Sequence, residues 1–259
     1  MANRPFVFGT NFKMNQTPQE SVEFYRRLIG STPIRPGVQL YVVPPLTSLA
    51  AVAAAAAADP ATVWVGAQNM HWAADGAFTG EISARMLKAL QVDLVLIGHA
   101  ERRGLFNEQD VELNKKVHAA IEAGMQVLLC VGETGEERAF GVSAETVAKQ
   151  LKIDLHQVNP SSAAQILVAY EPVWSIGTGG VPATPDDIAP IASLIRETLR
   201  TMFGDSCRMV PILYGGSVNA ENAGSFATIP EIDGLLVGRA GWTVESYTKT
   251  LEAALSARP

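Results

Sequence analysis

The sequence predicts an α/β protein that forms a single-domain (β/α)8 barrel over residues 1–259. Three observations support this prediction. The length of 259 residues suits one barrel, a fold that commonly has about 250 residues. Eight short apolar runs recur along the chain with helical patterns between them, and no stretch resembles a linker between two domains.

The eight runs are rich in Val, Ile, Leu and Phe, and their near-continuous apolarity is typical of parallel strands buried on both faces. The expected strands are Phe6–Gly9, Val38–Val43, Val63–Ala67, Leu94–Ile97, Val127–Val131, Ile166–Tyr170, Val210–Tyr214 and Leu235–Val237.

Helical patterns follow most of these runs and are long enough for parallel crossovers. They cover Ser21–Ile29, Leu49–Ala58, Val111–Ala123, Ala144–Val158, Ile188–Phe203 and Thr243–Leu255. Thr17-Pro18 with Glu20 has the pattern of a capped helix start, as has Thr184-Pro185-Asp186-Asp187. The alanine-rich run between Pro45 and Asp59-Pro60 is too short for a membrane span, which needs about 20 residues, and predicts a packed helix.

An open, doubly wound sheet is the structural alternative. That fold usually has a glycine fingerprint after its first strand, where this chain has Asn11 and Lys13. The barrel is therefore the preferred prediction.

Composition limits the possible partners and surroundings. Apolar residues make up 47% of the chain, and the net charge of -6 argues against nucleic-acid binding, which favours clustered Lys and Arg. Two distant cysteines, Cys130 and Cys207, suggest neither a disulfide framework nor metal-ligand spacing. No secretory signal opens the chain, so we expect a cytoplasmic protein with no membrane partner, no metal and no organic cofactor.

Polar residues follow the expected strands at the points where those strands end. A barrel enzyme carries its active site at this face. The residues are Asn11, Lys13, Gln68, Asn69, His99, Glu171, the turn 215–217 and Gly238.

The segment 170–179, YEPVWSIGTG, places one acid beside a glycine-bearing loop. A carboxylate with apolar neighbours is poorly solvated, which favours proton abstraction. We therefore expect Glu171 to be a general base and the loop to be a mobile lid. The alternative is an ordinary surface carboxylate at a strand end.

Five motifs, in order along the chain, resemble the triosephosphate isomerase family. They are Asn11–Asn15 (NFKMN), Gly98–Arg103 (GHAERR), Cys130–Glu133 (CVGE), the Glu171 segment and Tyr214–Val218 (YGGSV). The resemblance covers essentially the whole chain. It implies a TIM barrel that isomerises a small phosphorylated sugar through a cis-enediolate.

The resemblance implies that Glu171 moves the proton between adjacent carbons, that His99 acts as a neutral proton donor to the substrate oxygens, and that Lys13 with Asn11 stabilises negative charge. Alternation along an extended segment predicts that Asn11 and Lys13 point to the same face. Taken singly, His99 could be structural and Lys13 a solvated surface residue. Lys13 could also form a Schiff base, as in an aldolase.

Three glycine-bearing turns predict a phosphate site, because glycine lets backbone N–H groups approach an anion closely. They contain Gly177, Gly216-Ser217 and Gly238-Arg239. Any one of these glycines could instead merely turn the chain.

Two further features are expected to support the site. Glu101, with Arg102 and Arg103, either forms an ion network near Lys13 or is a solvated helix start, and Cys130 is expected to be a packed core thiol. The long loop 68–81 is expected to be functional. The resemblance implies that it enters a partner subunit, with Thr79 near the partner's Lys13 region, so we expect a homodimer; the alternative is a self-packed loop.

Several positions depart from the family pattern. Ala100 replaces a serine whose hydroxyl could hold the glutamate, while Gly180, Arg239 and Trp242 replace a lysine, a glycine and a leucine. Met70-His71-Trp72, the segment 180–184 and Gly238-Arg239 followed by Trp242 are more similar to the L-erythrulose 1-phosphate isomerase branch, whose substrate has four carbons. A substrate of that kind is therefore expected ahead of a triose phosphate, and a barrel that only binds phosphate ligands is the remaining alternative.

Overall fold

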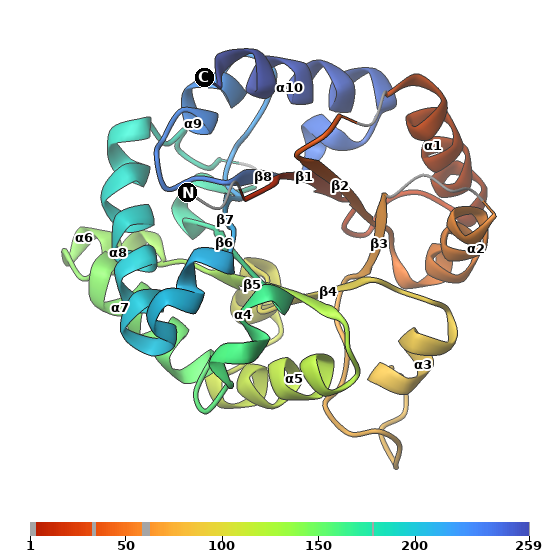
Figure 1. Ribbon diagram of the computed structural model, residues 1–259, viewed down its shortest axis with the longest axis horizontal. Helices are drawn as coiled ribbons and strands as arrows, with labels where there is room; N and C mark the ends of the chain where they lie inside the picture. Colours follow the sequence, from red (N-terminus) through yellow and green to blue (C-terminus); the bar gives the residue numbers. More distant parts are fainter. Residues whose placement is uncertain (1–3, 33–34, 59–62, 178, 259) are drawn as a thin grey trace.

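The computed structural model describes residues 4–32, 35–58, 63–177 and 179–258. Asp59-Pro60, expected to bound a helix, and Thr178 of the expected lid lie outside these ranges. Eight parallel strands form one closed barrel in chain order, as Figure 1 shows. They are β1 Phe6–Asn11, β2 Val38–Val43, β3 Trp64–Ala67, β4 Leu94–Ile97, β5 Gln126–Val131, β6 Ile166–Tyr170, β7 Ile212–Tyr214 and β8 Gly234–Val237.

The barrel closes where β8 pairs with β1. Val7 is in register with Gly234, and Asn11, at the other end of β1, is in register with Val43 of β2. A Cβ atom on Gly234 would lie 2.0 Å from the Val7 carbonyl oxygen, so glycine permits this close approach. The predicted (β/α)8 fold is confirmed.

Helices surround the barrel (Figure 1). They are α1 Pro18–Ser31, α2 Leu46–Ala57, α3 Ala84–Ala89, α4 Ala100–Leu105, α5 Asp110–Glu122, α6 Gly135–Ala139, α7 Ser143–Asp154, α8 Pro185–Phe203, α9 Ala223–Ala227 and α10 Val244–Ala257. The two predicted starts are confirmed, because Thr17 and Thr184 each form a capping box, with Glu20 and Asp187 respectively.

Two strands differ by two residues from their predicted bounds, and the change in β1 affects the site. β1 runs on to Asn11, so this residue is the last of its strand and not the first of a loop. β7 begins at Ile212 and not at Val210. Pro211 has no N–H to donate to a ladder, although its carbonyl still accepts from Val168 at 3.0 Å.

Alternation along the strands produces two apolar layers. One set of side chains fills the interior of the barrel, and the other packs against the helices. The interior set is Val7, Tyr41, Val43, Leu94, Leu96, Leu128, Cys130, Leu167, Ala169, Leu213 and Leu236. Cys130 is fully buried among them, as predicted for a core thiol, and the floor of the barrel mouth is thereby solid.

A buried ion cluster links the loop after β3 to α4 and α5. Glu108 accepts from Arg102 at 2.7 Å and from Lys116 at 2.6 Å, and Lys116 also donates to Asn69 at 2.9 Å. Burial alone would raise the pKa of Glu108, but these two cations outweigh it and lower the pKa below its usual value. Glu108 is therefore held as a carboxylate.

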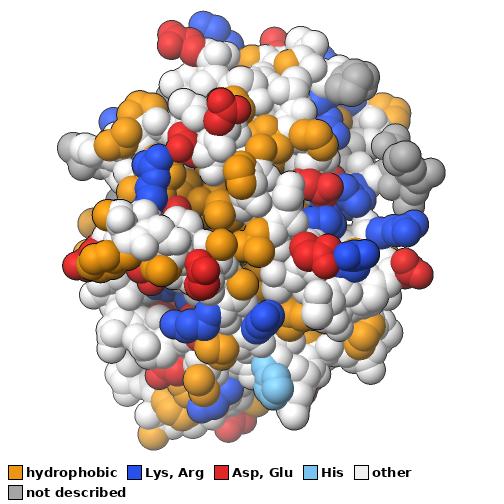
Figure 2. Space-filling model, turned by 90° about the vertical axis from the view of Figure 1, so that its left-hand side faces the viewer, with side chains coloured by type: hydrophobic (Ala, Val, Ile, Leu, Met, Phe, Trp, Pro, Cys, Tyr) orange, Lys and Arg blue, Asp and Glu red, His pale blue; other side chains and the backbone are white. Residues whose placement is uncertain are grey.

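Elsewhere on the surface, basic and acidic side chains are interspersed over the face in Figure 2. Among the described helices, none is both long enough and apolar enough to cross a membrane.

The first prediction concerns Glu108→Gln. Because the pKa of Glu108 is lowered in the folded state, its contribution to stability is present above the unfolded pKa of about 4.3 and disappears as the pH falls through the folded pKa. Removing one partner of a buried pair should reduce the free energy of unfolding by about 3 kcal/mol at pH 7. Urea denaturation at pH 7 and pH 3.5 measures the effect, which should shrink at the lower pH.

Glu122→Gln is the matched control, because Glu122 is an exposed residue of α5. It should leave the free energy of unfolding within about 0.5 kcal/mol of the unmodified protein. An equal loss in the Glu108 variant at both pH values would contradict the electrostatic explanation.

Candidate active site

A pocket of about 720 Å³ opens at the carboxyl ends of the strands. Its lining comes from β1 and β8 and from the segments that follow β1, β4, β6, β7 and β8. The predicted residues that line it are Asn11, Lys13, His99, Glu101, Glu171, Gly177, Gly216, Ser217, Gly238 and Arg239. The structure therefore brings together the proposed catalytic and phosphate-binding residues, whereas Gln68, Asn69 and Thr79 do not line the pocket.

Lys13 lies directly beyond β1 and pairs with α4. Its Nζ donates to Glu101 Oε1 at 2.6 Å, which is the ion contact predicted near Lys13. Arg102 and Arg103 instead bond elsewhere, to Glu108 and to Asp110 with Asp154. The expected three-residue network at Lys13 is thus reduced to Glu101.

The backbone of Lys13 corrects the alternation argument. Its φ is +52°, so the residue is left-handed and not extended, a conformation that costs a non-glycine residue on the order of 1 kcal/mol. Its N–H donates to Asn11 Oδ1 at 2.8 Å. Gln68 also holds the segment, because its Nε2 donates to the Lys13 carbonyl at 2.8 Å and to Asn11 Oδ1 at 3.2 Å.

His99 is the N-cap of α4 and is almost fully buried. Its Nδ1 accepts from the Glu101 N–H at 3.2 Å. A ring nitrogen that accepts carries no proton, so a neutral His99 carries its proton on Nε2. Nε2 lies 3.4 Å from Glu171 Oε1, and the ring can therefore exchange a proton on the pocket side.

Glu171 follows β6 and is only 2% exposed. Its Oε2 accepts from the Ala100 backbone N–H at 2.9 Å. The missing serine hydroxyl at position 100 thus leaves a main-chain donor in place. Cys130 lies beside this carboxylate, and burial together with the charge of Glu171 raises the pKa of the Cys130 thiol, so the thiol stays neutral.

The segment after Glu171 is anchored at its start. The Trp174 indole donates to Glu133 at 2.7 Å, and the Arg138 guanidinium lies 3.6 Å from the centre of the indole ring system. Ile176 and Gly177 line the pocket. At Gly180, which replaces the lysine of the family pattern, a Cβ would lie 2.7 Å from the Ser175 carbonyl carbon, so this tight turn favours glycine.

The turn after β7 contacts the same segment. A Cβ on Gly216 would lie 2.1 Å from the Tyr214 hydroxyl and 2.7 Å from Ser175 Oγ, so these groups already occupy that space.

In the turn after β8, Arg239 is exposed, and its guanidinium has no hydrogen bond or ion pair with the described residues. It is therefore available to an anion at the pocket mouth.

Thr79 lies outside the pocket, in the exposed part of the loop between β3 and α3. The loop projects beyond the ring of helices at the lower right of Figure 1. Its base packs on itself, since the His71 ring lies 4.1 Å from both the Trp72 and the Phe78 ring. The loop therefore combines self-packing at its base with an exposed tip.

The sequence did not predict that Trp242 holds the end of β1 by hydrogen bonding. Its indole donates to the Asn11 carbonyl at 3.0 Å, and its own carbonyl accepts from Gln16 at 3.1 Å. Trp242 and Ser246 both line the pocket. The departure from the family pattern at Trp242 was visible in the sequence, but its partner lies 231 residues away.

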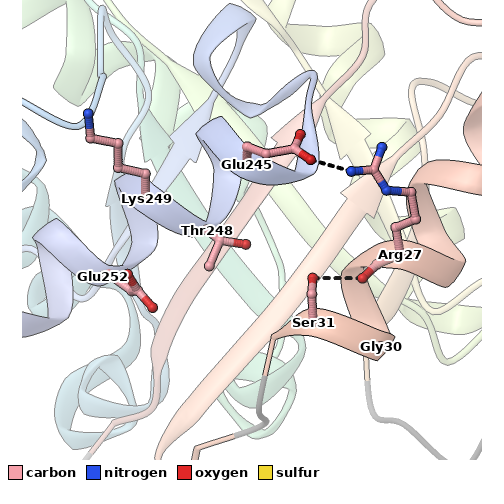
Figure 3. Close-up of a pocket in the computed structure, with 7 residues that line it drawn as sticks. All are labelled: Arg27, Gly30, Ser31, Glu245, Thr248, Lys249 and Glu252. Carbon is pink, nitrogen blue, oxygen red and sulfur yellow. Dashed lines mark hydrogen bonds and ion pairs between the residues drawn. The ribbon is translucent and has the colours of Figure 1, made fainter.

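A second hollow, of about 500 Å³, lies outside the barrel between α1 and α10 (Figure 3). Arg27 pairs there with Glu245, and Ser31 donates to the Arg27 carbonyl. Its charged side chains are exposed, and it carries no base or proton donor like those at the strand ends.

Within the described ranges, no group of three or more His, Cys, Asp or Glu could hold a metal ion.

A closed parallel barrel that gathers a carboxylate, an imidazole and an ammonium at its strand ends has the architecture of a barrel enzyme suited to acid–base chemistry. Comparison with known proteins narrows this class. A family model described as triosephosphate isomerase matches residues 5–254. The chain therefore belongs to the triosephosphate isomerase family, and the resemblance found in the sequence is confirmed.

Individual relatives carry two different names. The triosephosphate isomerase of Acetivibrio thermocellus is 42% identical over 253 residues, which cover 95% of this chain and 97% of that protein. The L-erythrulose-1-phosphate isomerase of Rhizobium etli is 44% identical over 245 residues, 94% of this chain and 90% of that protein. Its namesake from Rhizobium rhizogenes is 40% identical over 252 residues, 96% and 95%. The chain is thus an isomerase with similar identity to both groups.

The second prediction concerns Gly132, which follows β5. A Cβ there would lie 1.9 Å from the Glu171 carbonyl oxygen, so Gly132→Ala must displace the main chain of Glu171. A shift of about 1 Å can cost on the order of a hundredfold in rate, and we expect kcat for the sugar phosphate to fall by that order. Steady-state kinetics on protein checked for folding by circular dichroism measures it.

Gly135→Ala is the control, because the nearest contact of its new Cβ, with Trp174 Cβ at 3.5 Å, is an ordinary one. It should retain kcat within about twofold. Full activity of the Gly132 variant would mean that the close approach does not position Glu171.

Proposed function

We propose that this protein isomerises a small phosphorylated sugar by moving a proton between adjacent carbons through a cis-enediolate. The main support is one observation: the buried Glu171 carboxylate lies 3.4 Å from His99 Nε2 in a pocket that also contains Lys13. This chemistry needs a base, a proton donor and a fixed positive charge. Those groups come from side chains, so the proposal includes no metal and no organic cofactor.

In the proposed reaction, Glu171 removes the proton from a carbon beside the carbonyl and returns it to the neighbouring carbon. Oε2 is held by Ala100, so Oε1, on the His99 side, is the oxygen free to reach the substrate. His99 Nε2 passes a proton between the two substrate oxygens. Lys13, fixed by Glu101 and by the amide of Asn11, stabilises the negative charge that develops on them.

The phosphate would bind at the glycine-bearing turns. Gly177, Gly216 with Ser217, and Gly238 all line the pocket, and glycine permits backbone N–H groups to approach an anion closely. Arg239 adds a guanidinium with no partner among the described residues. Main-chain N–H groups and the Arg239 guanidinium would thus bind the negatively charged phosphate.

For the substrate, we propose the interconversion of L-erythrulose 1-phosphate and D-erythrulose 4-phosphate. The support is the similarity to the two Rhizobium proteins named L-erythrulose-1-phosphate isomerase, together with the departures at Arg239 and Trp242. Ala100 is compatible with the added hydroxymethyl group. The runner-up is triosephosphate isomerisation, supported by the relative from Acetivibrio thermocellus.

Two other functions fit less well. A Schiff-base aldolase would use Lys13 as a nucleophile, but Lys13 Nζ donates to Glu101, which suits a fixed cation. A barrel that only binds a phosphate ligand would not require Glu171 and His99 to face each other.

Both cysteines of the chain are free and buried, which fits the cytoplasmic setting that we propose.

The third prediction tests the base through Glu171→Asp. The variant withdraws the carboxylate by one methylene, and proton transfer requires a reach of about 3 Å. We expect kcat to fall by at least about a hundredfold with little change in KM. The assay follows L-erythrulose 1-phosphate and dihydroxyacetone phosphate in deuterated water, with deuterium in the product as the mark of proton transfer.

Glu122→Asp, at an exposed position of α5, is the control and should keep full activity. A Glu171→Asp enzyme as fast as the unmodified one would reject Glu171 as the base. A clear preference of the unmodified enzyme for dihydroxyacetone phosphate would reject the four-carbon substrate. Failure with both sugars, and no deuterium uptake, would reject the isomerase itself.

The loop 68–81 is proposed to join two copies into a homodimer, with Thr79 near the partner's Lys13 region. Large apolar side chains are exposed on both surfaces that would meet: Met14, next to Lys13, is 95% exposed, and Phe78 of the loop is 44% exposed. Covering both side chains in a dimer would remove their apolar surface from water, which favours association. A dimer would thus shield the site's edge.

The fourth prediction tests this surface through Met14→Glu. A buried charge at an interface is costly, so we expect the dimer to dissociate at micromolar concentrations and kcat to fall. Sedimentation equilibrium measures the mass. Met209→Glu is the control at another exposed methionine and should remain dimeric, whereas a monomeric unmodified protein would contradict the proposal.

A further inference from the structure

Arg103 lies beneath the active site and joins two strand ends to two carboxylates. Its Nε donates to the Gly98 carbonyl at 2.8 Å, and its Nη2 donates to the Cys130 carbonyl at 3.0 Å. The same guanidinium pairs with Asp110 at 2.5 Å and with Asp154 at 2.6 Å. All four contacts use the planar fork, which only arginine supplies.

The two carbonyls belong to residues that adjoin the proposed chemistry. Gly98 directly precedes His99, and Cys130 carries the thiol beside Glu171. Gly98 has a φ of +74°, and a Cβ there would lie 2.9 Å from Arg103 Nη2. The guanidinium thus fills the space behind this turn and fixes the peptide from which His99 projects.

The carboxylates keep the guanidinium in place. Asp154, at the end of α7, is fully buried, and Asp110 begins α5. Burial tends to lower the pKa of Arg103, but the charges of Asp154 and Asp110 outweigh it and raise the pKa. Arg103 is therefore a permanent cation, held by the carboxylates of α5 and α7. It also donates to the Gly98 carbonyl, just after β4, and to the Cys130 carbonyl in β5.

We propose that Arg103 is a positioning residue for the isomerase reaction, and that it sets the placement of His99 relative to Glu171 by clamping the Gly98 and Cys130 carbonyls. This inference rests on the proposed function, because it assigns a use to the relative placement of those two side chains. Arg103 does not line the pocket and acts only through the main chain.

A second arginine provides a matched control at the opposite end of the barrel. Arg196 donates to the carbonyls of Cys207 and Val210, each at 2.8 Å, and pairs with Glu231 and Asp233. Its side chain is 14% exposed, against 13% for Arg103. It lies where β7 and β8 begin, so it has the same kinds of partner and a similarly buried side chain without proximity to the site.

The fifth prediction compares Arg103→Lys with Arg196→Lys. Lysine keeps the charge but cannot bond two carbonyls and two carboxylates at once. Both variants should lose thermal stability. Only Arg103→Lys should lower kcat, by about tenfold to a hundredfold, with KM within about twofold because the phosphate turns are untouched. Kinetics are measured at a temperature where circular dichroism shows both variants folded.

The outcomes separate this inference from the proposed function. If the unmodified enzyme turns over neither sugar, the proposed function fails. If it is active and Arg103→Lys keeps its kcat, or if Arg196→Lys loses as much, the positioning role is rejected. Should Arg103→Lys not fold, Asp110→Asn replaces it: the amide still accepts from Arg103 but lacks the charge, so a severalfold fall in kcat supports the role and an unchanged kcat rejects it.

Discussion

The parallel pairing of β8 with β1 is the constraint on which the site depends. It places the segment after β8 beside the end of β1, so that Trp242 reaches the Asn11 carbonyl, 231 residues away in the chain. Without closure, the base on β6, the histidine after β4 and the lysine after β1 would lie along an open edge. Closure turns that edge into a ring, and residues spread over most of the chain then share one pocket.

Inside this ring, Glu171 and Lys13 are each held by a residue of α4, which is distant from both in the sequence. The Ala100 N–H donates to Glu171, which follows β6, while Glu101 accepts from Lys13, which follows β1. Short, charge-assisted bonds of this kind cost little reorganisation during a reaction. The geometry of the pocket is consequently a property of several strand ends and not of any one loop.

Local patterns in the sequence predicted the fold and the order of the strands, and together with the family resemblance they predicted about half of the residues that line the pocket. They worked because apolar runs and cap residues report directly on strands and helix starts. They failed for the backbone of Lys13, since the left-handed turn there depends on Asn11 and Gln68 as hydrogen-bond partners. Bonds from side chains to distant carbonyls, as at Trp242 and Arg103, carry no local pattern.

The hydrogen bond from the main-chain N–H of Ala100 to Glu171 affects which residues the family can have at position 100. Any residue except proline supplies that N–H group, so drift at this position leaves the contact intact. A serine or an alanine there would then distinguish lineages by history or by pocket shape and would be a poor marker of whether the reaction is retained. Classifying family members as active or inactive by their residue at this position would therefore exclude active enzymes.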